Sequence, residues 1–250
     1  MKTSCLNRRG ASRSLAVAVA VAVVLLLARP GAALAQQVLV QANVADDTLK
    51  TTFGPNRRYF AHGYLGYGLV AGPAGVGAAV RYGAYSSELR LGGRLKVRLN
   101  QTLALHTDLA YTYLRFELTQ QAAKTIPTPA LHEREAFGLH QAGAELGLRL
   151  NYGRRGNAVG RYLDLLAGGS WVAASTHSTS ETPGPGVASR EVTEHGLDYL
   201  RRWSGGTGAR LGFDRYALTA RYRLTPIFAP ANANWPELPR WVLGLELGIF

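Results

Sequence analysis

The sequence predicts an all-β protein: a single eight-stranded antiparallel transmembrane up-and-down β-barrel that follows a cleaved signal peptide. Three observations predict this fold. Apolar and charged residues alternate, the connections between strand segments alternate in length, and aromatic residues gather toward both ends of those segments. The clearest alternation covers 86–99, where apolar residues hold the odd positions and charged residues the even ones. A period of two is that of a β-strand with two unlike faces, and it does not fit an amphipathic helix.

Residues 1–35 have the order of a secretory signal peptide. Basic residues come first, an apolar run covers 15–28, and Ala33-Leu34-Ala35 forms a small-x-small cleavage site. The alternative is an uncleaved anchor helix, but Arg29 and Pro30 end the run short of the roughly 20 apolar residues that a span needs. We therefore expect the mature chain to begin near Gln36. Cys5 is the only cysteine and leaves with the signal, so the mature chain would form no disulfide.

Three parts follow from this division: the signal peptide 1–35, a periplasmic N-terminal segment 36–58 and the barrel 59–250. The formal charge of +12 falls to +7, because five basic residues and no acids belong to the signal. Basic charge can indicate nucleic-acid binding. Here the chain is exported and its arginines are spread along alternating strands, so we expect no nucleic-acid partner.

Eight segments carry strand signals, and the connections between them differ in length. The connections after the second, fourth and sixth segments are short, whereas the others are long and polar. This asymmetry is typical of transmembrane barrels, which have tight periplasmic turns and longer extracellular loops. The predicted strands cover 59–70, 86–99, 102–118, 137–150, 160–172, 198–213, 216–225 and 240–250.

Aromatic residues mark both ends of the predicted strands, as the two girdles at the lipid-water boundaries of a membrane barrel do. Toward the long loops lie Tyr111, Tyr113, Trp171, Trp203, Tyr222 and Trp241. Toward the short turns lie Tyr59, Phe60, Tyr152, Tyr162, Phe213, Tyr216 and Phe250.

With these features the chain resembles the bacterial outer-membrane β-barrel domain family, as a small porin-like member. The resemblance covers about 59–250 and includes the ending W-V-L-G-L-E-L-G-I-F at 241–250. It implies a place in the outer membrane of a Gram-negative cell envelope. It also implies that the terminal aromatic, Phe250, is part of the signal read by the barrel-insertion machinery. Here Leu243, Leu245 and Leu247 lie in the opposite phase to Phe250.

Energy decides which face meets lipid. Aiming a strand's arginines at hydrocarbon would cost about 2–4 kcal/mol each near the midplane, so the charged face must point into the barrel. Many small residues on the polar faces agree with a narrow lumen. The rival is a soluble barrel with leucines inside and arginines in water. The lumen charge network that we predict comprises Glu88, Arg90, Arg94, Lys96, Arg98, Asp108, Glu145, Arg149, Asp164, Arg202, Arg210, Arg221, Arg223 and Glu246, with His62, Tyr64, His106 and Gln141 as hydrogen-bonding partners.

An eight-stranded barrel is only wide enough for side chains to fill, so this network should act as a plug. Nine basic residues against five acidic ones leave a surplus that could attract an anion. Two functions from different classes therefore stay open. One is a structural or surface-interaction protein whose loops 119–136, 173–197 and 226–239 contact lipopolysaccharide, matrix or a partner protein. The other is a narrow pore for small solutes or anions.

A lipid-modifying enzyme is a third, less favoured function. Its best candidate is His177-Ser178-Thr179-Ser180 with Glu181 or Glu191, but a Ser/Thr/Pro/Gly loop offers little fixed geometry for an activated nucleophile. His132-Glu133-Arg134-Glu135 lacks a second histidine at metal-binding spacing. Arg154-Arg155 and the glycines of 205–208 are weak phosphate-binding candidates, since no helix follows the glycines. We therefore expect no catalytic residue, no cofactor and no metal.

Overall fold

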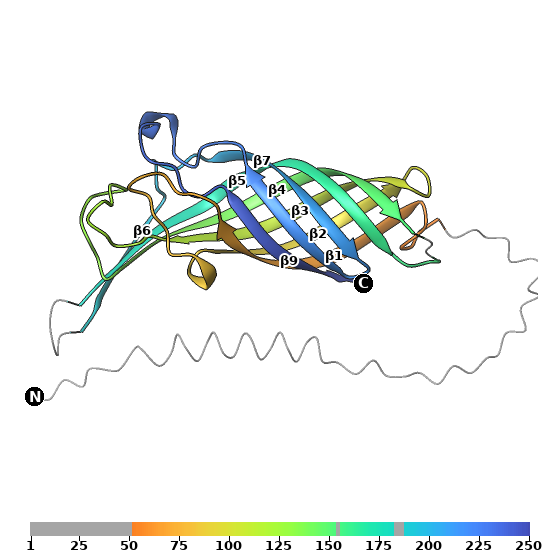
Figure 1. The fold of residues 1–250 in the computed structure, drawn as a ribbon, viewed down its shortest axis with the longest axis horizontal. Coiled ribbons are helices and arrows are strands. Elements are labelled where there is room, and N and C mark those ends of the chain that lie inside the picture. Colours follow the sequence, from red (N-terminus) through yellow and green to blue (C-terminus); the bar gives the residue numbers. More distant parts are fainter. Residues whose placement is uncertain (1–51, 154–155, 183–187) are drawn as a thin grey trace, which may run out of the picture. The chain divides into compact units, whose positions relative to one another are not determined.

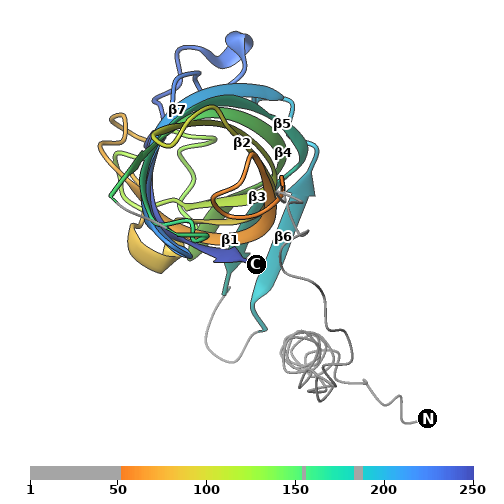
Figure 2. The same ribbon diagram turned by 90° about the vertical axis from the view of Figure 1, so that its right-hand side faces the viewer.

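The computed structural model describes residues 52–153, 156–182 and 188–250, which form a closed antiparallel barrel (Figures 1 and 2). Ring closure is made by the first strand, which pairs with the second on one side and with the last on the other. The ring consists of β1 (Tyr59–Ala71), β2 (Ser87–Arg98), β3 (Leu103–Glu117), β4 (Arg134–Tyr152), β5 (Arg161–Glu181), β7 (Trp203–Phe213), β8 (Tyr216–Arg223) and β9 (Trp241–Ile249). The predicted eight-stranded barrel is confirmed.

Two short 3-10 helices, η1 (Gly83–Tyr85) and η2 (Pro230–Asn232), lie in the connections. Within the described ranges no helix is both long and apolar enough to cross a membrane. The signal peptide 1–35 and most of the segment 36–58 lie outside the described residues.

The predicted strands fail at one place, the long connection after β5. We expected a loop over 173–197, but β5 continues to Glu181 and pairs with an additional strand, β6 (Arg190–His195). β4 likewise begins at Arg134 instead of 137. A strand of about 9–11 residues crosses a bilayer, whereas β4 has 19 residues and β5 has 21. Both strands therefore project well beyond the barrel mouth, carrying β6 with them (Figure 1).

The faces of the barrel follow the predicted parity. Leu91, Leu109 and Leu245 are 56%, 64% and 64% exposed on the outside. Inward-facing Arg94 and Asp108 are 2% and 0% exposed. Leucine outside and arginine inside excludes the rival soluble barrel, because water would favour the reverse arrangement.

Small residues in the wall leave room for the large inward side chains. A side chain at Gly147 would collide with the His106 ring, and one at Gly212 would collide with the Tyr162 ring. Tyr162 and Phe60 are themselves buried in the lumen, at 3% and 4% exposure. Placing these two rings in the girdle at the short-turn end was therefore wrong, since their parity turns them inward. Exposed Tyr59, Tyr152 and Tyr216 do lie at that end.

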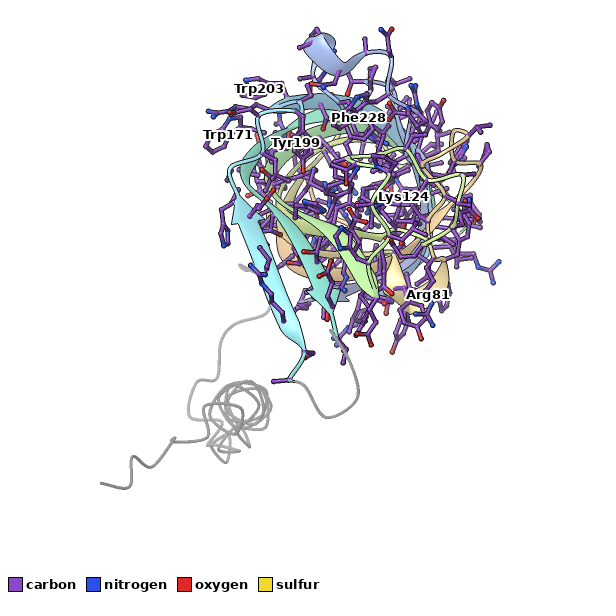
Figure 3. The ribbon with its side chains drawn as sticks, turned by 90° about the vertical axis from the view of Figure 1, so that its left-hand side faces the viewer. Arg81, Lys124, Trp171, Tyr199, Trp203 and Phe228 are labelled. Carbon is purple, nitrogen blue, oxygen red and sulfur yellow. The ribbon has the colours of Figure 1, made fainter. Side chains whose placement is uncertain are left out.

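At the long-loop end the connections fold over the barrel mouth and bury a separate apolar cluster, which we call the loop cap. It combines residues from the upper strands with residues from all four long connections: Val70, Ala78, Val80, Leu114, Phe116, Leu118, Ile126, Phe137, Leu139, Val172, Leu197, Leu200, Ile227, Phe228 and Leu238. In the view onto this end, Lys124 lies over the mouth, whereas Arg81 and Trp203 lie at its outer edge (Figure 3). The loops are therefore packed parts of the fold.

Candidate functional site

The centre of the lumen is a layer of ion pairs contributed by strands from the whole ring. Arg94 on β2 donates to Asp108 on β3 at 2.9 Å and to Glu246 on β9 at 2.7 Å. Arg210 on β7 reaches the same Asp108 at 3.0 Å. All four side chains are at most 4% exposed. Each buried charge thus has opposite charges at contact distance, as a low-dielectric interior requires.

Asp164 on β5 completes this central layer. It accepts from Arg149 at 2.7 Å and from Arg210 at 2.8 Å. The His106 ring lies between the two aspartates, with Nδ1 3.0 Å from Asp108 and Nε2 3.4 Å from Asp164. Three arginines therefore face three carboxylates, and these six charges balance.

A second layer lies on the long-loop side of the first. Arg90 and Arg221 contact the same Oε1 atom of Glu145, at 2.9 Å and 3.4 Å, and Arg221 is 3.8 Å from Glu88. The hydroxyl of Tyr64 accepts from Arg90 at 3.3 Å. Between this layer and the loop cap is a cavity of about 100 Å³, also lined by Gln141. Such a volume holds several water molecules.

The positive charge of the lumen is smaller than the sequence predicted, because the connections remove one base from the network and add one acid to it. Arg202 is exposed because β7 begins only at Trp203, so its place in the network was wrong. Arg223 pairs with Glu237 at 2.8 Å, an acid from the loop after β8 that strand parity could not find. The two layers and this pair together hold six arginines and six carboxylates: Arg90, Arg94, Arg149, Arg210, Arg221 and Arg223 with Glu88, Asp108, Glu145, Asp164, Glu237 and Glu246. These balanced pairs leave no surplus of positive charge among them to attract an anion.

The two remaining bases, Lys96 and Arg98, lie at the short-turn end. They donate to the backbone carbonyls of Pro55 and Asn56, which precede β1. Beside them His62 stacks on Phe60 at 4.9 Å between ring centroids. Phe250 packs edge-on against Phe60 at 5.3 Å. This end of the lumen is thus lined by aromatic rings and by the chain segment that leads into β1.

A buried polar cluster fixes the loop cap. The Glu135 carboxylate, fully buried, contacts Lys124 Nζ at 2.5 Å and His177 Nε2 at 2.9 Å, and it accepts from Gln120 Nε2 at 3.0 Å. All of these groups lie beyond the membrane-crossing part of the strands. Burial raises the pKa of Glu135, but the hydrogen bonds from His177, Lys124 and Gln120 outweigh it, so its pKa lies below the ordinary value.

This cluster also settles the geometry of the candidate nucleophile. β5 carries a bulge at Ala173, since His140 pairs with Ala174 and Gln141 with Val172. The bulge turns His177 inward to Glu135, while the next side chain, Ser178, meets Thr193 on β6 at 3.0 Å. Successive strand residues point to opposite faces, so His177 and Ser178 do not form a catalytic pair.

The sequence also offered a metal-binding candidate around His132 and two phosphate-binding candidates. His132 lies 2.6 Å from Glu181, and the described residues contain no group of side chains arranged to hold a metal. The glycines of 205–208 lie in β7, with strand instead of helix after them. Arg154-Arg155 lies outside the described residues.

On the outer face above the girdle, three arginines surround one acid. Glu117 is contacted by Arg81 at 3.3 Å, by Arg115 at 3.2 Å and by Arg134 at 3.3 Å. Arg81 also stacks on Tyr85 at 3.5 Å, and the buried Nε of Arg115 has no hydrogen-bond partner among the described residues. The group carries a net charge of +2 and faces outward. Sequence reasoning missed it because two of its arginines come from outside the predicted strands.

The closed ring and its two unlike faces define the class of protein to which this chain belongs. Only helices and closed barrels satisfy their backbone inside lipid, and a closed ring with leucines outside and ion pairs inside is that of an eight-stranded outer-membrane β-barrel protein. No protein-family model and no curated protein matches the chain.

Two solved structures of the Yersinia pestis attachment invasion locus protein Ail are similar to it. One contains the heparin analogue sucrose octasulfate, with 10% identity and a TM-score of 0.33; the other has 9% identity and a TM-score of 0.35. Each comparison covers 76% of this chain and 97% of Ail.

Proposed function

We propose that this chain is a non-enzymatic outer-membrane barrel that presents a sheet extension beyond the membrane to a surface partner, around a lumen that does not conduct. The observation that carries the proposal is the extension itself. In the described part of the chain β6 pairs only with β5, and all six of its residues are exposed. Its second edge therefore offers backbone donors and acceptors to an added strand.

An open strand edge supports recognition of an extended peptide. Strand addition draws its affinity from main-chain hydrogen bonds and its specificity from alternate side chains. Soluble proteins usually protect such edges, because they otherwise aggregate. β6 carries Arg190, Glu191 and Glu194 beside Val192, and this charge limits unspecific pairing while leaving the edge open.

Cell attachment tests this role. Cells that display the protein should adhere to protein-coated surfaces better than cells without it. Val192→Lys should remove the difference, since an added charge opposes strand pairing. Val76→Lys, a matched change at a 92% exposed valine in another loop, should preserve adhesion. Equal adhesion of all these cells would disprove the surface role.

The arginines around Glu117 support a contact with lipopolysaccharide. Three guanidinium groups beside the exposed Tyr85 lie where the strands leave the membrane, and guanidinium groups bind phosphate through paired hydrogen bonds. We also propose that Phe250 contacts the barrel-insertion machinery.

The side chains inside the lumen support the choice against a pore. Two balanced ionic layers, the aromatic short-turn end and the loop cap lie along the path through the barrel and support a plugged lumen. Planar-bilayer recording should show no steady conductance; a stable open level would favour the narrow pore. A lipid-modifying enzyme would require that His177→Ala or Ser178→Ala abolish a change in lipid acylation.

A further inference from the structure

A groove runs along the outer wall of the barrel at the short-turn end. Its volume is about 490 Å³, and its lining residues come from β4, β5, β7, β8 and β9. The floor is apolar, because Leu211, Leu218 and Leu245 line it and are 49%, 60% and 64% exposed. Large aromatic side chains, Phe213 and Tyr216, border it at 61% and 67% exposure. The groove is continuous with the leucine surface that faces lipid.

Two arginines lie at the short-turn end of this apolar floor. Arg161, at the first position of β5, lines the groove, and its guanidinium lies 5.9 Å from the centre of the Phe213 ring. Arg215 occupies the turn before Tyr216 and lies 5.1 Å from the Phe250 ring. Asp214 is the acid of the same turn. An arginine can rest its stem on an aromatic surface while its charged head stays at the aqueous boundary.

We propose that this groove is a binding site for an anionic phospholipid of the leaflet at the short-turn end. The acyl chains would lie on Leu211, Leu218 and Leu245, and Arg161 and Arg215 would bind the phosphate. Charge complementarity selects a negative headgroup, and continuity with the lipid-facing wall selects a lipid over a free ion. The inference rests on the proposed membrane position and concerns the end opposite to β6.

Native mass spectrometry of the folded protein can count retained lipids. The protein would be released from micelles that contain either phosphatidylglycerol or phosphatidylcholine. We expect retention of phosphatidylglycerol, with Arg161→Gln and Arg215→Gln each weakening apparent affinity about fivefold. Leu218→Trp, which fills the groove without changing charge, should reduce retention of both lipids. A heat-dependent gel shift verifies that each variant is folded.

The matched control for each single arginine change is Arg202→Gln, which removes an exposed arginine at the long-loop end and outside β6. It should retain phosphatidylglycerol like the wild type. Equal retention by the Arg161 and Arg215 variants would overturn the site, as would an equal loss in the control. Inorganic phosphate that displaces the lipid at millimolar concentration would overturn the assignment to a lipid. None of these outcomes depends on adhesion through β6, so the two proposals fail separately.

Discussion

The middle of the barrel and its loop cap place the same kinds of side chain on opposite sides of the wall. On β3, Asp108 points inward and its neighbour Leu109 points outward. Eight residues further along the same strand, Phe116 points inward and Glu117 points outward among arginines. The strand keeps its period of two while the chemistry of its faces reverses.

The surrounding medium explains the reversal. Where lipid surrounds the barrel, burying leucine inside gains nothing, so the interior holds ions that satisfy one another. Where water surrounds it, apolar burial again stabilises, and the cap is an ordinary hydrophobic core. The position at which the faces exchange thus marks the membrane boundary within a single strand.

The largest change in the free energy of unfolding is expected for a substitution among the ion pairs of the lumen. Asp108→Ala leaves Arg94 and Arg210 buried without this shared partner, so we expect a loss of about 3–5 kcal/mol in the free energy of unfolding. Urea titration in lipid vesicles, followed by tryptophan fluorescence, measures it. Asp198→Ala, at an exposed aspartate, should stay within about 0.5 kcal/mol of the wild type. A small effect at Asp108 would mean that water enters the centre of the lumen.

The next test concerns the outer wall. Leu109→Arg places a charge in hydrocarbon, and we expect it to cost about 2–4 kcal/mol. Leu131→Arg, at a leucine 55% exposed in the loop before β4, should cost little, because water surrounds that loop. The same urea titration compares them. Equal costs at the two positions would place both in the same medium and contradict the membrane boundary.

The smallest effect is expected in the cap, and it depends on pH. Glu135 has a lowered pKa in the folded state, so its contacts stabilise the cap above the ordinary carboxyl pKa of about 4.3 and are lost as pH falls through the folded value. Glu135→Gln should cost about 1.5–3 kcal/mol at neutral pH and remove this acid dependence.

Hydrogen exchange of residues 118–133 reports on the cap separately from the barrel. After correction for the intrinsic exchange rate, the wild type should show less protection in acid than at neutral pH, while Glu135→Gln should show low protection at every pH. Glu133→Gln, at an exposed glutamate of the same loop, is the control for the lost charge and should keep the acid dependence. Unchanged acid dependence in Glu135→Gln would show that another group holds the cap.

Strand periodicity was enough to predict the ring and the inward arginines of β2, because a one-residue slip would expose several charges to lipid. It could not predict the bulge at Ala173, which reverses the phase of β5 and turns His177 inward. Nor could it place Arg202 or Glu237, since neither lies in a ring strand and connections have no period. The apolar residues of the cap, such as Ile126 and Phe228, are scattered through polar connections for the same reason.

The ion pairs at the centre join distant parts of the chain: Arg94 comes from the second strand of the ring and Glu246 from the last. A chain that is still being inserted therefore carries guanidinium groups whose counter-charges have not arrived. A chain truncated before β9 would leave Arg94 and Arg210 without Glu246, which both of them contact. The final strand thus supplies the last buried counter-charge, so the charges in the lumen balance only when the whole barrel has formed.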